Sequence, residues 1–387
     1  MSAPQRNLYT IVYQALKERI EQNEMKDGDK LPSERELAEQ FEVSTITTKK
    51  ALDLLVDEGL VVRRRGLGSF VQLNDTAKRK ALSGQSDPMS GGKRIIGLVM
   101  EDFSSSFGLE LLRSIESAAA KNNYHLCIKR SLGDQNLEEE AIDQLFSIQA
   151  DGIIIMPSHG KHYSKKILKM IADGFPIVFV DRYLSGIPGA YVGTDNENGA
   201  KQLIEHLFAH GHREIGIVSA SPEDAVTLKD RMDGYLQAHS EHGLRVPEQQ
   251  MLCKVRTTQP FNRSESGAEE DIQRVCEFLQ QHPDMTAVFA AEYENALIVK
   301  KAGERLGRTI PQQLSLVCFD VPNDYLSDIN ITHIKQDEEK MGELAVELLH
   351  QQILLPDTPA NQLKIAGMFV QGSSVSTKNE ESEHATP

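Results

Sequence analysis

A run of hydroxyl and amine side chains begins at Ser44, where a helix is expected to start. It continues through Thr45, Thr47, Thr48 and Lys49. Hydroxyl and ammonium groups can donate to phosphate oxygens and to the edges of bases, so this run has the chemistry needed to contact DNA. The alternative is that these residues are ordinary exposed positions of a helix.

A second group of basic and glycine residues lies on either side of this run. Arg65, Gly66 and Gly68 form a turn between two apolar stretches, and Arg35 stands near the start of the preceding expected helix. Arginine presents a planar fork of donors to phosphate, and glycine allows a backbone to approach closely. The turn could therefore lie along a DNA groove, although a solvated hairpin would have a similar composition.

Polar side chains also follow short apolar runs in the rest of the chain. Ser104, Ser158, Asp181-Arg182 and Asp320 all stand at or just beyond the ends of such runs. If the runs are parallel strands, their carboxyl ends meet at one edge of a sheet, where ligands of such folds bind. Carboxylate, guanidinium and hydroxyl groups gathered there would suit a small polar ligand.

The elements that would position the first two groups can be predicted from the N-terminal part of the chain. Apolar residues recur at helical spacing over 8–20. Ser33, followed three positions later by Glu36, predicts a capping box at the start of a second helix. A third helix is expected over about 44–58, and the apolar stretches of 60–71 predict a β-hairpin.

From Arg94 onward, short apolar runs alternate with helical patterns. Continuous apolar runs are typical of strands covered on both faces, and intervening helices favour parallel crossovers. The fold class is therefore α/β, with a doubly wound sheet architecture. The runs are residues 95–100, 125–130, 152–157, 176–181, 214–219, 287–291 and 314–320.

These patterns divide the chain into four segments. Residues 1–73 form the expected DNA-binding domain, and 94–375 form the expected ligand-binding and dimerisation domain. Residues 74–93 are rich in serine, glycine and charge, and are interpreted as a linker. Residues 376–387 are polar and are expected to form a disordered tail.

The distribution of charge supports this division. The whole chain has a net charge of −15, but its first 80 residues contain 14 basic and 13 acidic side chains. Within 44–80 there are 8 basic and 4 acidic side chains. A basic segment at one end of an acidic protein is typical of a small DNA-binding domain attached to a body that repels DNA.

Composition also limits the compartment. No apolar run reaches the roughly 18 residues of a membrane span, and the first residues lack the apolar core of a secretory signal. The four cysteines are scattered and form no CxxC pair, which favours reduced thiols. The sequence therefore predicts a cytoplasmic protein.

The sequence contains no complete catalytic or metal-binding pattern. His206, His210 and His212 have a spacing that zinc can use, but no carboxylate pattern completes a site. Their place near an expected helix end favours a structural role. With no glycine-rich nucleotide loop and no GxSxG motif, we expect no catalytic residue, no metal and no cofactor.

Residues 8–73 resemble the GntR family of winged helix-turn-helix regulators. The resemblance implies that Arg35, the 44–49 run and the 65–68 turn contact DNA. Thr45 and Lys49 stand where the family usually has arginine, so the operator is expected to differ from the common half-site. Glu42 replaces a frequent glycine. The matching segments are 31–38, 41–44, 51–55, 58–60 and 65–71.

The rest of the chain resembles the effector domain of LacI-type repressors, which is similar to periplasmic sugar-binding proteins. A GntR-type head on a LacI-type body is the arrangement of arabinose-type repressors. The resemblance implies two lobes joined by crossings near Gly193, near Ile334 and within 360–365. The matching segments are 96–99, 150–154, 178–182, 192–196, 210–215, 230–235, 287–291, 316–320 and 332–337.

The same resemblance implies a sugar between the lobes, with Phe107 packing on it and polar groups pairing with its hydroxyls. Alternatives remain for three of the polar groups: Asp181 or Asp320 could cap a turn, and Arg231 could pair with Asp230 or Asp233. The implied ligand-binding residues are Ser104, Phe107, Ser158, Asp181, Arg182, Arg231, Glu292, Asp320 and Gln336.

The pocket also departs from the LacI pattern. Glu292 and Tyr293 stand where the family typically has Asn-Asp. An ionised glutamate is an acceptor only, so it should favour a hydroxyl-rich or cationic ligand over an anionic one. Arg130 and Arg182 nevertheless leave sugar phosphates open.

These expectations combine into a homodimeric repressor of carbohydrate genes that binds a palindromic operator and is released by a sugar. The alternatives are a solute-binding protein that acts without DNA, an enzyme in which the head is fused to an aminotransferase-like body, and an activator whose DNA binding is promoted by ligand.

Overall fold

The computed structural model divides the chain into two units, Met1–Gly92, called the head, and Lys93–Pro387, called the body. The residues that the structure describes are 8–21, 24–26, 28–41, 43–57, 60–64, 68–71, 94–158, 164–256, 264–322, 330–355 and 360–378.

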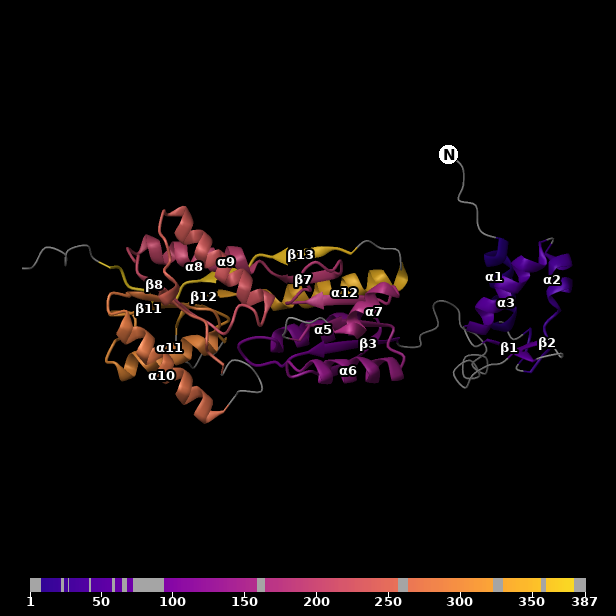
Figure 1. Ribbon diagram of the computed structural model, residues 1–387, viewed down its shortest axis with the longest axis horizontal. Coiled ribbons are helices and arrows are strands. Elements are labelled where there is room, and N and C mark those ends of the chain that lie inside the picture. The colour runs from indigo at the N-terminus through magenta and orange to yellow at the C-terminus, as the bar shows by residue number, and fades with distance from the viewer. Residues whose placement is uncertain are drawn as a thin grey trace, which may run out of the picture. The chain divides into compact units, whose positions relative to one another are not determined.

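The head is a helical bundle with a hairpin, built around one apolar core (Figure 1). Its helices bury Leu16, Leu37 and Leu52 completely, at the helical spacing that the sequence predicts. The backbone of 28–31 pairs with the second hairpin strand, which anchors the hairpin to the helices. The elements are α1 (Leu8–Glu21), α2 (Glu34–Gln40), α3 (Thr45–Asp57), β1 (Val61–Arg64) and β2 (Gly68–Val71).

The predicted helix starts are confirmed. Ser33 caps α2: its hydroxyl accepts from the Glu36 amide, while the Glu36 carboxylate accepts from the Ser33 amide at 2.7 Å. Ser44 precedes α3, and its hydroxyl accepts from the Thr47 amide at 3.2 Å. These contacts satisfy amides that a helix N-terminus leaves without intrahelical partners. The expected helix end at Gly59 and the turn residue Glu42 lie outside the described residues.

Thr48 is not a surface residue, and its expected role in DNA contact is wrong. Its side chain is fully buried, on the helix face shared with Leu52 and Leu55. Its hydroxyl donates to the carbonyl of Glu34 at 2.9 Å and lies 3.0 Å from that of Thr45. Thr48 therefore joins α2 to α3 inside the helix-turn-helix.

The body consists of two lobes, each with a sheet covered by helices on both faces (Figure 1). In the N-lobe the strand order is β13-β7-β6-β5-β3-β4, and all pairings among the described strands are parallel. Its elements are β3 (Arg94–Met100), α5 (Leu109–Lys121), β4 (Tyr124–Arg130), α6 (Gln135–Ser147), β5 (Gly152–Ile155), α7 (Lys165–Ala172), β6 (Ile177–Val180), β7 (Ala190–Thr194), α12 (Glu338–Leu354) and β13 (Gln362–Ile365).

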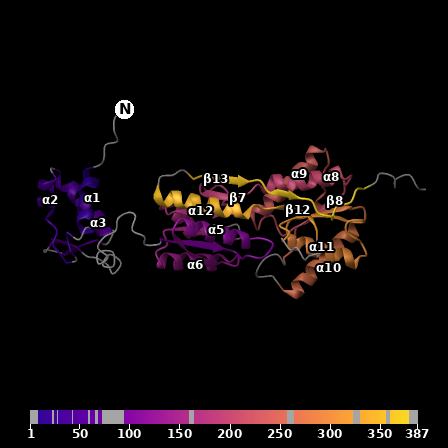
Figure 2. The ribbon, with the colours of Figure 1, turned by 180° about the vertical axis from the view of Figure 1, so that it is seen from behind.

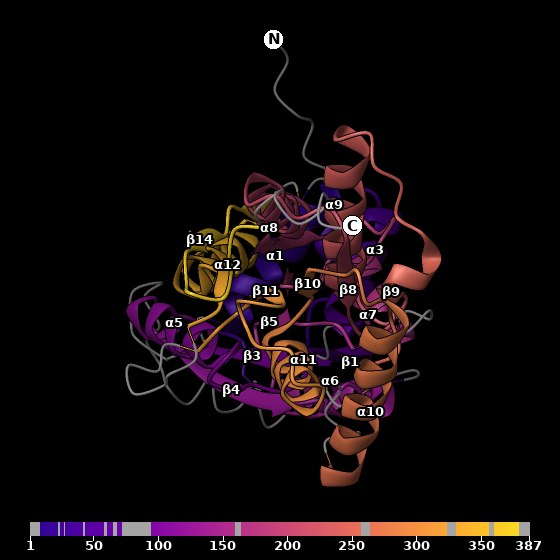
Figure 3. The ribbon, with the colours of Figure 1, turned by 90° about the vertical axis from the view of Figure 1, so that its left-hand side faces the viewer.

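The C-lobe repeats this plan with the strand order β14-β12-β11-β10-β8-β9, in which β14 alone runs antiparallel to its neighbour among the described pairings. Figure 3 shows α8 and α9 on one side of the sheet and α10 and α11 on the other. Its elements are α8 (Asn196–Ala209), β8 (Ile215–Val218), α9 (Val226–Glu241), β9 (Met251–Leu252), α10 (Glu265–Gln281), β10 (Ala287–Ala290), α11 (Tyr293–Arg305), β11 (Ser315–Phe319), β12 (Thr332–Lys335) and β14 (Met368–Val370).

The doubly wound α/β architecture predicted from the apolar runs is therefore confirmed, and each of those runs is a strand of one of the two sheets. The chain passes between the lobes where β7 leads into α8, where β12 leads into α12, and where β13 leads into β14 (Figure 2). The third passage follows Ile365, at the end of the range expected for it.

Residues 376–378, expected to belong to a disordered tail, are described by the structure, whereas 379–387 lie outside the described residues. The Ser376 amide donates to the hydroxyl of Ser315 at 3.0 Å, and the Lys378 amide donates to the carbonyl of His210 at 2.9 Å. These bonds attach residues 376–378 to the C-lobe. The linker expected over 74–93 lies outside the described residues.

Replacing Thr48 by valine tests its buried role. The change keeps the side-chain volume but removes the donor to the Glu34 carbonyl, so we expect the head to lose about 1–2 kcal/mol of stability. In the full-length protein, hydrogen exchange of α2 and α3 amides should accelerate about five- to thirty-fold. The same change at exposed Thr45 serves as the control and should alter exchange less than twofold; equal effects at both positions would contradict the assignment.

Candidate functional site

The exposed side of α3 presents some of the predicted DNA-contacting groups. Thr45 and Lys49 lie one turn apart and are exposed, and Thr47 is half-buried beside the Ser44 hydroxyl, 2.8 Å away. Ser44 therefore both caps the helix and stands at its exposed end. This arrangement offers donors at a helix N-terminus, where a DNA phosphate is favoured by the helix dipole.

Two arginines of the head are already engaged with acidic side chains. Arg35 is exposed and pairs with Glu39 at 3.3 Å. Arg63, on β1, pairs with Asp53 at 2.9 Å and with Glu34 at 3.3 Å. Arg63 therefore holds the hairpin against the helices.

The wing itself is described only in part. Gly68 begins β2 and is paired with Arg64 across the hairpin. Arg65 and Gly66 lie outside the described residues, so their expected contact with DNA stays a prediction.

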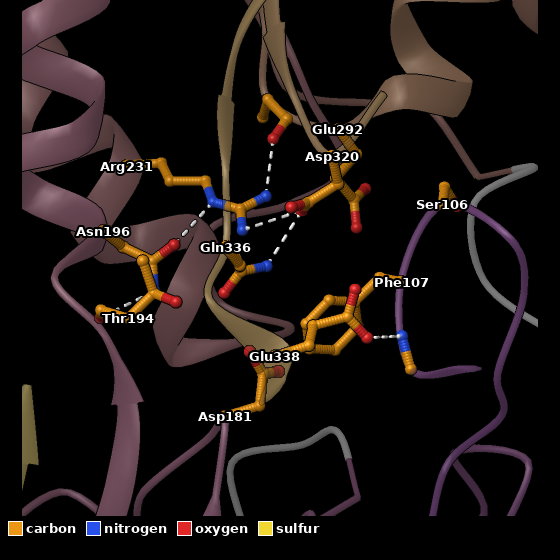
Figure 4. Close-up of polar contacts among 12 residues, drawn as sticks. Ser106, Phe107, Asp181, Thr194, Asn196, Arg231, Glu292, Asp320, Gln336 and Glu338 are labelled. Atoms are coloured by element: carbon orange, nitrogen blue, oxygen red, sulfur yellow. Dashed lines mark hydrogen bonds and ion pairs between the residues drawn. The ribbon is translucent and has the colours of Figure 1, made fainter. Parts of the chain in front are cut away.

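In the body, a cleft of about 110 Å³ lies between the lobes at the carboxyl ends of their strands. Eight of the nine predicted ligand-binding residues line it, and Figure 4 shows most of the cluster. The cleft is lined by Glu101, Asp102, Phe103, Ser104, Ser106, Phe107, Met156, Asp181, Arg182, Ala220, Thr227, Leu228, Arg231, Glu292, Tyr293, Glu294, Asp320 and Gln336.

Asp181 and Asp320 occupy equivalent places in the two lobes. Asp181 follows β6 and Asp320 follows β11, and both adopt left-handed backbone angles, with φ of 63° and 64°. This conformation is uncommon outside glycine, although aspartate tolerates it better than most residues. Each lobe thus uses a strained strand end to direct a carboxylate into the cleft.

Arg231 is the most firmly held polar group of the cleft. Its Nε donates to Asn196 Oδ1 at 2.8 Å, and one terminal nitrogen donates to the Ala291 carbonyl at 2.7 Å. The other lies 3.5 Å from Asp320, and the guanidinium stacks 3.9 Å from the Phe319 ring centre. Its partner is therefore Asp320, whereas Asp230 bonds to Tyr183 at 3.3 Å.

Asp320 is held by two side chains in return. Besides Arg231, the Gln336 amide nitrogen donates to the Asp320 carboxylate at 2.9 Å. Burial raises the pKa of Asp320 to about 7, although Arg231 and Gln336 oppose that rise. The Gln336 side chain is 3% exposed, and its carbonyl oxygen has no hydrogen-bond partner among the described residues.

Arg182 and Glu292 complete the charged lining. Arg182 pairs with Glu101 at 2.5 Å and lies 3.8 Å from Asp181. Burial raises the pKa of Glu292 to about 6, and the nearby Glu294 carboxylate raises it further. The carboxyl groups of Asp320 and Glu292 therefore change charge close to neutral pH.

Phe107 supplies the apolar face opposite these groups. It packs on the N-lobe core, in a loop that Ser104 closes by donating its amide to the Phe107 carbonyl at 2.8 Å. After Phe107, the Glu338 carboxylate accepts from the amides of Gly108 and Leu111, at 2.7 and 3.1 Å. Glu338 starts α12 directly after a crossing, so this bond links the crossing to the Phe107 loop.

Ser158 does not lie in this cleft. Its amide donates to the buried Glu138 carboxylate at 2.6 Å, and it lines a neighbouring cavity of about 340 Å³ together with Arg182. The expectation that it contacts the same ligand as Asp320 is therefore not supported by its position.

Several cleft residues escaped the sequence analysis. Glu101 directly follows the apolar run of β3, so the rule that singled out Asp181 would have found it. Ser106 and Glu294 form a hydrogen bond of 3.0 Å across the lobes. No sequence signal pairs residues so far apart in the chain.

The histidine group has structural partners. The two ring nitrogens of His212 lie 2.8 Å from the Thr286 hydroxyl and 2.9 Å from the Ser376 carbonyl oxygen. His206 stacks near His210, with ring centres 4.3 Å apart.

Among the described residues, no helix is both long and apolar enough to cross a membrane.

Comparison with known proteins agrees with this geometry. Residues 8–71 match the model of the bacterial regulatory proteins of the gntR family, and residues 204–375 match that of a periplasmic binding protein-like domain. The arabinose metabolism transcriptional repressor of Halalkalibacterium halodurans is 26% identical over 347 residues, which cover 88% of each chain.

Two solved structures share the fold of the body. Transcription regulator CcpA of Lactococcus lactis has a TM-score of 0.63 at 21% identity, over 74% of this chain and 100% of its own. A LacI family transcriptional regulator from Enterococcus faecium, with bound ribose, has a TM-score of 0.62 at 22% identity, over 74% and 100%. The chain therefore joins a GntR-family helix-turn-helix domain to a periplasmic binding protein-like domain, in the GntR/LacI-type architecture.

Proposed function

We propose that this chain is a transcription repressor of carbohydrate-utilisation genes, which binds operator DNA through the head and is released by a sugar in the cleft. The observation that carries the proposal is the buried cluster of Arg231, Asp320 and Gln336, which faces Phe107 across two hinged lobes. Buried polar groups beside an aromatic face suit a ligand with ring carbons on one side and hydroxyls on the other.

The crossings between the lobes are the route by which a ligand in the cleft would change the affinity for DNA. Asn196, Gln336 and Glu338 all lie directly after a crossing, and each is bonded to the cleft cluster or to the Phe107 loop. A ligand that draws the lobes together would change all of these contacts at once. A coupling of about 1–3 kcal/mol between the two sites would change operator affinity by roughly five- to 150-fold.

The assembly and compartment are part of the proposal. We infer a homodimer in the cytoplasm, because a two-fold symmetric pair of heads would match a palindromic operator. The repressor name of the arabinose-related relative and the ribose in the Enterococcus faecium structure support a sugar-responsive role. No residue arrangement found in the described part of the chain favours an enzymatic reaction.

The first test concerns the DNA surface. A duplex selected by the protein from a random library should be retarded by the ligand-free, full-length chain, with an affinity that falls steeply with salt. Lys49→Ala removes an exposed cation of α3, so the slope of log affinity against log salt should fall by about one per head.

Lys121→Ala provides the matched control, since Lys121 is exposed on the body, and its slope should stay that of the unaltered protein. Absence of any retarded duplex at low salt would leave a solute-binding protein as the better description. Tighter retention in the presence of sugar would identify ligand-promoted DNA binding instead of release.

The second test concerns the ionisation of Asp320. A hydroxyl donates best to the ionised carboxylate, and the pKa of Asp320 is raised to about 7, so sugar affinity should increase as pH rises from 5.5 to 8. Asp320→Asn keeps the shape but not the charge. It should weaken binding about tenfold at pH 8 and flatten the pH dependence.

Calorimetric titration with a sugar found by thermal-shift screening supplies the measurement. Glu304→Gln, on the exposed side of α11, is the control and should keep the rise with pH. A pH profile that remains as steep in Asp320→Asn as in the unaltered protein would exclude Asp320 as the ligand's acceptor.

A further inference from the structure

Acidic groups outnumber basic groups in the cleft. The arginines among its lining residues are Arg182 and Arg231. The carboxylates are Glu101, Asp102, Asp181, Glu292, Glu294 and Asp320. With every group ionised, the cleft would carry a surplus of negative charge, which opposes a phosphorylated ligand.

The donors of the two arginines are largely committed to protein acceptors. Arg231 uses its nitrogens on Asn196, the Ala291 carbonyl and Asp320. Arg182 pairs with Glu101 and lies 3.8 Å from Asp181, and its Nε forms no hydrogen bond in the described structure. A ligand entering the cleft therefore meets acceptors more often than donors.

The surplus is concentrated at the start of α11. Asp102 has a cation partner in Arg130, at 3.1 Å. Among the described residues, Glu292 and Glu294 have no ion pair with lysine or arginine. Glu294 accepts from the Ser106 hydroxyl at 3.0 Å, whereas Glu292 accepts from the Asn295 side-chain amide at 3.4 Å.

A separate observation also indicates a missing donor. The carbonyl oxygen of Gln336 is buried and has no hydrogen-bond partner in the described structure, while the amide nitrogen of the same side chain is held on Asp320. An unsatisfied buried acceptor costs about 1–3 kcal/mol. Figure 4 shows Gln336 and Asp320 on the same side of the cleft as Glu292, with Phe107 across from them.

Donor and acceptor numbers then discriminate between ligand groups. A hydroxyl donates one hydrogen bond and brings lone pairs that also need partners, which this acceptor-rich wall supplies poorly. A protonated amine donates three and has no lone pair to satisfy. It also neutralises charge and can lie against the faces of Phe103, Phe107 or Tyr293, which line the cleft.

We propose that the effector is a hydroxylated organic cation, of the amino sugar or amino polyol class, whose ammonium group is bound by Glu292 together with Asp320 and the Gln336 carbonyl oxygen. This inference rests on the proposed function, because it names the chemistry of the ligand that the same cleft would bind. Glu292 becomes the specificity-determining residue, at the position where LacI-type bodies usually have asparagine.

The test compares amines with neutral compounds of matching shape. Full-length protein is titrated by calorimetry at neutral pH with D-glucosamine, D-galactosamine and glucamine, and with D-glucose, D-galactose and glucitol as their neutral partners. N-acetylglucosamine and glucose 6-phosphate complete the panel. We expect at least one amine to bind about tenfold or more tightly than its partner, since charge-assisted hydrogen bonds are stronger than neutral ones.

Variants assign the preference to a residue. Glu292→Gln keeps the side-chain shape and should reduce the amine-to-neutral ratio about tenfold. Glu304 lies on α11, the helix that Glu292 directly precedes, where it is exposed and 3.7 Å from Lys300. Glu304→Gln should therefore keep the amine-to-neutral ratio of the unaltered protein. Thermal midpoints of both variants without ligand show that each is folded.

The outcomes separate this inference from the function on which it rests. Neutral sugars that bind as tightly as their amines overturn the inference and leave a sugar-responsive repressor standing. An amine preference that survives in Glu292→Gln also overturns it. If no compound binds, the inference and the sugar effector both fail, while retardation of DNA by the ligand-free protein still tests the regulator itself.

Discussion

The burial of the Arg231 guanidinium is the constraint on which the body depends. Arg231 is only 4% exposed. A buried charge is tolerated only when its donors are satisfied and an opposite charge lies near. Asn196, the Ala291 carbonyl and Asp320 meet that need, and each lies just after the end of a different strand, β7, β10 or β11. The arginine therefore holds the floor of the cleft together before any ligand arrives.

The same cluster joins the cleft to the connections between the lobes. Asn196 begins α8 after the first crossing, and Gln336 and Glu338 flank the start of α12 after the second. A ligand contacting Asp320 thus changes a network whose other members determine how the lobes are connected. Two packed lobes that hinge on such short crossings have few intermediate arrangements, which suits a switch between two states.

Much of this arrangement could be predicted from the sequence, for reasons that are local. The capping box at Ser33 depends on residues three positions apart, and Asp181 and Asp320 are recognisable because they end apolar strands. The burial of Thr48 is hard to predict because a hydroxyl side chain suggests an exposed position, although Thr48 lies on the helix face that packs against the core. The pairs Arg182–Glu101 and Ser106–Glu294 join distant segments, so they depend on tertiary packing that no spacing reveals.

Charge composition alone would overestimate the affinity of the head for DNA. Arg63 is paired with Asp53 and Glu34, and Arg35 lies beside Glu39, so these cations are partly neutralised before DNA arrives. Lys49 has no ion pair in the described structure, so it is the better candidate for a phosphate contact in the proposed complex. In the proposed dimer, two such heads on one operator would combine their phosphate contacts and so raise the affinity above that of a single head.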